Sequence, residues 1–173
     1  MLRLIFAFVD IMLHRRGPDT LPSSPFLLFA LFALSCASDF VVLGLAGRSV
    51  RWFAVDVLVF GLNVWFAWAL LRTFNRQPRF RQTMTALLGS GLLLTLLQVP
   101  LVRSVVEPPP DPQNPSLTLP GLLWILIMIW AIDISAFVFS RALERPYLLC
   151  IAIVFGYVLL IESLQATLLQ PIA

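Results

Sequence analysis

Apolar residues occur along this chain in five long blocks, and the short stretches between the blocks hold most of the charged residues and prolines. Each block has about 20 residues, the length that an α-helix needs to cross the hydrocarbon core of a bilayer. The pattern therefore predicts five transmembrane helices, at residues 25–46, 52–71, 82–101, 121–140 and 147–169. Residues 103–120 are rich in proline and predict an extended loop, because proline does not continue a helix.

The first fourteen residues, MLRLIFAFVDIMLH, are apolar except for Arg3, Asp10 and His14. These three residues are spaced so that they share one face of a helix. The run is too short to span a bilayer, and Asp10 interrupts what would be the core of a signal peptide. We expect an amphipathic helix over residues 1–16 that lies in the membrane interface. A turn-rich linker, residues 17–24, follows it.

Composition supports a membrane protein. The chain has 173 residues, of which 60% are apolar and only 12% are charged, and its mean hydropathy is +0.92. These values lie far outside those of soluble domains. No polar stretch is long enough for a separate soluble domain, so we expect residues 1–173 to form one integral domain. The predicted fold class is an all-α membrane protein with five transmembrane helices and an interfacial N-terminal helix.

The arginines predict how the chain is oriented. All twelve basic residues are arginine, and they are densest in LRTFNRQPRFRQT, residues 71–83. When the five spans alternate in direction, nine arginines fall on the side of the N-terminus and three on the other: the nine are Arg3, Arg15, Arg16, Arg72, Arg76, Arg79, Arg81, Arg141 and Arg145, and the three are Arg48, Arg51 and Arg103. The positive-inside rule then predicts a cytoplasmic N-terminus and an external C-terminus. The absence of lysine indicates a GC-rich bacterial genome, so we expect the membrane to be a bacterial inner membrane.

The arginine-rich stretch also bears on partners. We expect Arg72, Arg76, Arg79 and Arg81 to fix the topology and to contact anionic membrane lipids. The arginines flank apolar runs and form no basic surface with interleaved aromatic residues, so no nucleic-acid partner is expected.

Each predicted span carries polar or small residues three, four or seven positions apart, which places them on one helical face. Five such faces predict a bundle with a polar interior. The residues are Ser35, Ser38 and Asp39; Asp56 and Asn63; Gly91, Thr95 and Gln98; Asp133, Ala136 and Ser140; and Glu162 and Gln165.

Four of these residues, Asp39, Asp56, Gln98 and Glu162, form the candidate functional or structural cluster, because all lie near the outer ends of their spans. An acid inside a membrane costs roughly 2.5 to 3.5 kcal/mol, so such residues are normally paired. We favour a structural interpretation, in which they form outer ion pairs and hydrogen bonds with Arg48, Arg51 and Arg103. The alternatives are a proton- or ion-responsive site built from Asp39, Asp56 and Glu162, and a polar surface that docks a partner subunit. Asp133 is expected to pair with Arg141 or a loop arginine.

Motifs for catalysis are missing from the sequence. His14 is the only histidine, which excludes a site of several histidines, and no HExxH, Walker A or GxSxG pattern occurs. The stretch 89–91, Gly-Ser-Gly, is typical of close helix packing. Cys36 and Cys150 lie inside apolar spans as small apolar residues. We therefore expect a non-enzymatic protein with no catalytic residue, cofactor or metal.

The entry to the first span, LPSSPFLLFALFAL, the third span, TMTALLGSGLLLTLLQVPL, and the five closely spaced helices together resemble the Yip family of membrane proteins. The resemblance implies a non-enzymatic helix bundle that works through protein or lipid contacts. The leading hypothesis is a scaffold, assembly factor or accessory subunit of a membrane complex, which would associate with other membrane subunits or with itself. The alternatives are an ion- or proton-linked transport subunit that uses the outer acids and a lipid-binding membrane protein.

Overall fold

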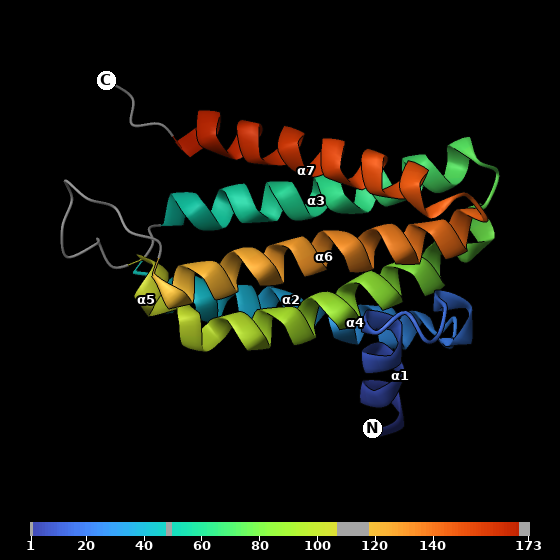
Figure 1. The fold of residues 1–173 in the computed structure, drawn as a ribbon, viewed down its shortest axis with the longest axis horizontal. Helices are drawn as coiled ribbons and strands as arrows, with labels where there is room; N and C mark the ends of the chain where they lie inside the picture. The colour runs from blue at the N-terminus through green and yellow to red at the C-terminus, as the bar shows by residue number, and fades with distance from the viewer. Residues whose placement is uncertain (1, 48–49, 107–117, 170–173) are drawn as a thin grey trace.

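The computed structural model of the protein describes residues 2–47, 50–106 and 118–169. Five long helices run side by side and alternate in direction (Figure 1). They are α2 (Pro25–Leu45), α3 (Val50–Thr73), α4 (Phe80–Gln98), α6 (Leu119–Leu143) and α7 (Tyr147–Leu169). All five are long and apolar enough to cross a membrane. The predicted all-helical fold with five transmembrane helices is confirmed.

The shorter elements lie between and before these helices. They are α1 (Leu2–Met12), α5 (Val102–Val106) and three 3-10 turns, Pro18–Thr20, Gln77–Arg79 and Val99–Leu101. The predicted proline loop is shorter than residues 103–120, because α5 occupies its start and α6 already begins at Leu119. The middle of that loop, residues 107–117, lies outside the described residues.

Two spans begin where the sequence supplies both a cap and a proline. Ser24 accepts a hydrogen bond from the Leu27 amide at 3.4 Å, and Thr118 accepts one from the Gly121 amide at 3.4 Å. Pro25 and Pro120 follow, where the missing N–H costs nothing because the first amides of a helix have no intrahelical partner. These caps set the starts of α2 and α6.

The two ends of the bundle differ in charge. We call the end where α3 and α6 finish the basic end, and the opposite one the far end. The described arginines at the basic end are Arg15, Arg16, Arg72, Arg76, Arg79, Arg81, Arg141 and Arg145. At the far end, Arg51 donates to the Leu168 carbonyl at 2.6 Å. Arg48 and the side chain of Arg103 lie outside the described part of the chain.

Helix α1 runs perpendicular to the long helices, and its N-terminal part projects away from the bundle (Figure 1). Phe8, Ile11 and Met12 are buried against α4 and α6, while Phe6 and Val9 are exposed on the outward side. The helix ends at Met12, not at residue 16. His14 adopts a left-handed backbone, with φ of 58°, so the prediction that it shares a helical face with Arg3 and Asp10 is wrong.

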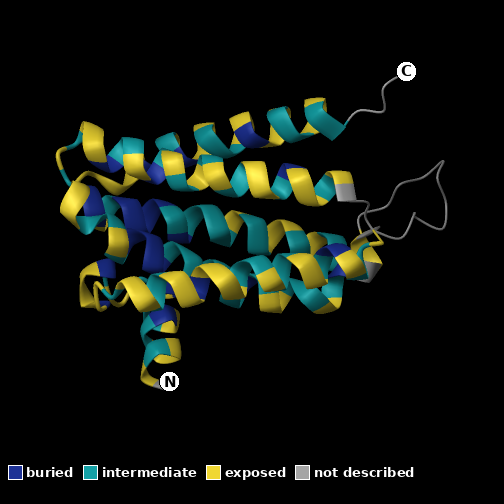
Figure 2. Ribbon diagram, turned by 180° about the vertical axis from the view of Figure 1, so that it is seen from behind, coloured by how far each residue is buried: buried dark blue, intermediate teal, exposed yellow. Residues whose placement is uncertain are grey.

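The interior is packed most densely near the basic end (Figure 2). One apolar cluster joins α1 to α4 and α6, and a second one joins α3, α4, α6 and α7 around Leu71, Met84, Phe139 and Leu143. Toward the far end the long helices enclose two cavities instead. The apolar interior is therefore filled near the basic end, and the two cavities lie beyond it toward the far end.

Candidate functional site

The two cavities adjoin each other, and we call the pair the chamber. The cavity nearer the far end has a volume of about 390 Å³ and is lined by α2, α3, α4, α5 and α6. The deeper one has a volume of about 300 Å³ and also borders α7. Four residues, Asp39, Phe60, Asn63 and Thr95, line both cavities and mark the boundary between them.

Two carboxylates face this chamber from neighbouring helices. Asp39 lies on α2 and Asp56 on α3, both are partly exposed, and they are close enough to repel each other. Within the described part of the chain, no hydrogen bond or ion pair to the Asp39 carboxylate is present. Negative charge in a membrane-spanning helix is costly unless a cation or proton neutralises it. The chamber is thus suited to a positively charged group.

The other polar residues of the chamber are largely committed to partners within the protein. The Tyr157 hydroxyl donates to Asn63 Oδ1 at 3.0 Å, and its ring stacks on Phe66 with centroids 3.9 Å apart. The hydroxyls of Ser38 and Thr95 donate to carbonyls of their own helices, those of Ser35 and Gly91. Among the described residues, Asp39 is the charged residue that lines both parts of the chamber.

The floor of the chamber is apolar. Phe139 and Met84 line its deeper part and also belong to the packed cluster at the basic end. Phe139 is 3% exposed, and its ring meets Phe66 edge to face at 5.7 Å between centroids. Phe139 therefore bounds the chamber toward the packed cluster at the basic end.

The four-residue cluster predicted from sequence is brought together in part. Asp39, Asp56 and Gln98 line the same cavity, where Gln98 Nε2 also lies 4.0 Å from the sulfur of Met128. Glu162 does not line the chamber and is exposed on α7. Tyr157 was not among the residues predicted from the sequence. Its hydroxyl and the Asn63 side chain are both polar groups inside a span, and such groups need a hydrogen-bond partner.

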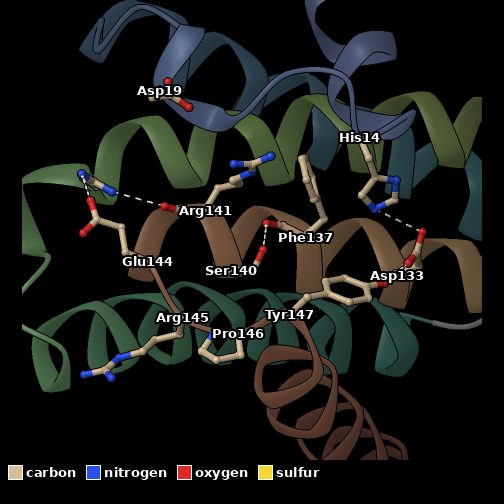
Figure 3. A pocket seen from close by; sticks show the side chains of 11 residues that line it. His14, Asp19, Asp133, Phe137, Ser140, Arg141, Glu144, Arg145, Pro146 and Tyr147 are labelled. Atoms are coloured by element: carbon tan, nitrogen blue, oxygen red, sulfur yellow. Dashed lines mark hydrogen bonds and ion pairs between the residues drawn. The ribbon is translucent and has the colours of Figure 1, made fainter.

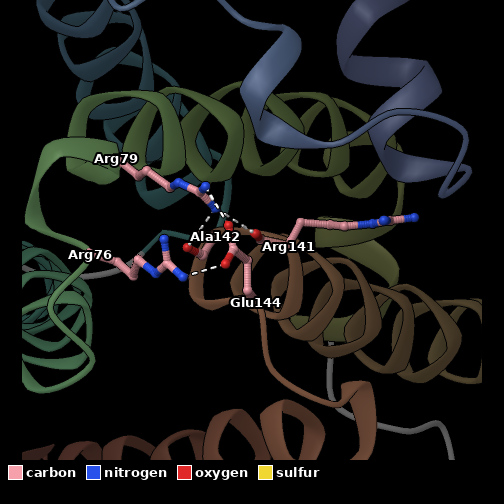
Figure 4. Close-up of polar contacts among 5 residues, drawn as sticks. All are labelled: Arg76, Arg79, Arg141, Ala142 and Glu144. Atoms are coloured by element: carbon pink, nitrogen blue, oxygen red, sulfur yellow. Dashed lines mark hydrogen bonds and ion pairs between the residues drawn. The ribbon is translucent and has the colours of Figure 1, made fainter.

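The four arginines from the end of α3 to the start of α4 differ in their contacts, and Figure 4 shows two of them, Arg76 and Arg79. Arg76 and Arg79 both pair with Glu144, the latter at 2.5 Å, and Arg79 also donates to the carbonyls of Arg141 and Ala142 at 3.2 Å. These bonds tie the start of α4 to the end of α6, where Glu144 has a left-handed backbone. In contrast, Arg72 lies over the Trp68 ring and Arg81 is exposed.

Asp133 has partners that the sequence did not predict (Figure 3). Its carboxylate accepts a hydrogen bond from the Tyr147 hydroxyl and lies 3.4 Å from His14 Nε2, a contact outside hydrogen-bond geometry. The expected pairing with Arg141 or a loop arginine is wrong: among the described residues Asp133 forms no ion pair with an arginine, and Arg141 lies over the Phe137 ring. His14 reaches Asp133 only because the chain turns at this left-handed residue, which the sequence pattern did not reveal.

His14 and Asp133 border a wide groove at the basic end, of about 1180 Å³. Arg79, Arg141 and Arg145 line it together with Asp19, Asp133 and Glu144, so its charges are mixed and partly paired with one another. A groove with this lining favours neither an anion nor a cation.

No group of three or more histidine, cysteine, aspartate or glutamate residues in the described ranges is arranged to hold a metal ion. The chain matches no protein-family model, no curated protein and no solved structure. Its resemblance to the Yip family therefore stays a prediction, and any function has to be argued from the chamber and the surfaces of the bundle.

Proposed function

We propose that this chain is a non-enzymatic subunit of a transport system in a bacterial inner membrane, and that its chamber binds a small cation or a protonated amine. The basic end lies in the cytoplasm and the far end outside, which the excess of arginine on one side supports. The chamber is then reached from outside and closed toward the cytoplasm.

The observation that carries the proposal is the position of Asp39. Its carboxylate lines both parts of the chamber, and Asp56 of the neighbouring helix α3 lines the part nearer the far end. A bound cation offsets the cost of keeping the Asp39 carboxylate inside the bundle.

Binding of Na⁺ and of ethylammonium to the purified full chain in a mild maltoside detergent tests this proposal. We expect one of these cations to raise the melting temperature, and Asp39→Asn to weaken its affinity by about tenfold or more, because a charge-assisted contact is lost. Glu162→Gln is the matched control, since this acid lies in a span but outside the chamber. Binding that Asp39→Asn leaves unchanged would contradict the proposal.

A second candidate, an accessory or scaffold subunit, is favoured by Glu162. This carboxylate and the neighbouring Ser163 and Thr167 are exposed on the outward side of α7, within a candidate span. A partner helix that presents a basic residue or a hydrogen-bond donor would lower the cost of a carboxylate at this position. Under this hypothesis a membrane subunit co-purifies with the wild type and with Asp39→Asn, but not with Glu162→Leu.

A further inference from the structure

An apolar groove on the side of the bundle adjoins the chamber. It has a volume of about 300 Å³ and runs between α2, α3 and α4 in the half nearer the basic end. Phe60, Met84 and Leu88 line both the groove and the deeper part of the chamber, so the two spaces adjoin. Phe29 and Phe32 border the groove on α2 and are 68% and 37% exposed, which places its mouth at the surface that faces lipid.

The combined space is amphipathic along its length. Its far end holds Asp39 and Asp56, whereas the groove is lined by apolar side chains such as Leu28, Val64 and Met84. Ten residues of α2 separate Phe29 from Asp39, or about 15 Å at 1.5 Å per residue. In the proposed orientation this order places a charged group toward the outside and an alkyl chain toward the cytoplasmic half of the bundle.

We infer that the chamber takes an amphiphile that carries a primary amine, with its ammonium group at Asp39 and one alkyl chain in the groove. The inference rests on the proposed function, because it names the class of the bound cation. A free small cation would use the acids but would leave the apolar groove without a role. An amphiphile with a purely anionic head group would place its charge against Asp39 and Asp56, which repel it.

The size of the groove fits one chain. A volume of about 300 Å³ holds about ten groups of roughly 30 Å³, the volume of one water molecule in the liquid, which is close to that of a methylene. The deeper part of the chamber adds a similar volume between the groove and Asp39. Burial of the chain contributes favourable transfer free energy that a short amine lacks.

Native mass spectrometry of the full chain in maltoside detergent tests this inference with three probes. Lysophosphatidylethanolamine carries both amine and chain, lysophosphatidylglycerol with the same chain lacks the amine, and ethylammonium lacks the chain. We expect lysophosphatidylethanolamine to bind about tenfold more tightly than either of the others, and Asp39→Asn to remove its advantage over lysophosphatidylglycerol.

A bulky side chain in the groove tests the alkyl-chain site separately from the amine site at Asp39. Val64→Trp should lower lysophosphatidylethanolamine binding to the level of ethylammonium while ethylammonium still binds, whereas Val57→Trp, on the exposed side of the same helix, should change neither. If Val64→Trp loses ethylammonium binding, Leu28→Trp replaces it as the groove variant. Equal binding of the two lysolipids, or no effect of the groove variants, would overturn the inference and leave the cation site standing. Absence of binding by both amines would overturn the inference, and absence of Na⁺ binding in addition would overturn the proposed function as well.

Discussion

Replacing Gly89 with leucine is expected to release α1 from the bundle. A Cβ atom at this position would lie 2.2 Å from the ring of Phe8, which is itself only 5% exposed. The two side chains cannot occupy this space together, and overpacking of this kind costs about 1 to 3 kcal/mol. Because the exposed face of α1 is already apolar, the helix can move away from α4 and remain in a membrane or a micelle.

Hydrogen exchange of the full chain in detergent measures this release. Amides of residues 2–12 should lose protection in Gly89→Leu, while α4 to α7 keep theirs. Gly91→Leu is the control on the same helix, since a Cβ there meets nothing within 4 Å. The double variant with Phe8→Ala should restore the docked helix. Unchanged protection in Gly89→Leu would show that Phe8 does not hold α1 against α4.

Truncation of Phe139 to alanine should both destabilise the bundle and open the floor of the chamber. Phe139 is 3% exposed, packs against Phe66 and separates the chamber from the cluster at the basic end. Phenylalanine-to-alanine changes in protein cores cost about 3 to 5 kcal/mol, because a cavity remains. This new cavity adjoins the chamber, so water and small reagents should reach further toward the basic end.

Phe137→Ala provides the matched control. Phe137 is 7% exposed and packs against His14, bordering the groove at the basic end and not the chamber. We expect both variants to lower the melting temperature. When each is combined with Thr95→Cys, only Phe139→Ala should let a membrane-impermeant thiol reagent on the cytoplasmic side label the new cysteine. Labelling in Phe137→Ala but not in Phe139→Ala would show that Phe139 does not form the floor of the chamber.

The sequence predicted the helices well because their signals are local. Span length and hydropathy depend on consecutive residues, and the starts of α2 and α6 follow from Ser24 and Thr118 with the prolines that come after them. The predicted end of α1 was wrong because the apolar pattern continues through Leu13. The chain instead turns at His14, which brings this side chain close to Asp133 in α6. Contacts between distant segments are not encoded in such patterns.

The candidate site was predicted in part for the same reason. Depth along each span correctly grouped Asp39, Asp56 and Gln98, since all three lie near the far end. The rotation of α7 could not be read from its sequence, which is apolar on almost every side. Packing of Cys150, Val154 and Ile161 turns that face inward and leaves Glu162 exposed. The apolar groove was not predicted, because it lies between three helices and has no motif.

The most direct test of the account is the accessibility of Thr95, which lines both parts of the chamber. Thr95→Cys would be made with Cys36 and Cys150 replaced by serine, beside the control Thr85→Cys on the same helix, whose native side chain is 0% exposed. The account predicts that a membrane-impermeant thiol reagent labels position 95 from the outside and not from the cytoplasm, and labels position 85 from neither side. Labelling of position 95 from the cytoplasm, or from neither side, would contradict a chamber that opens outward.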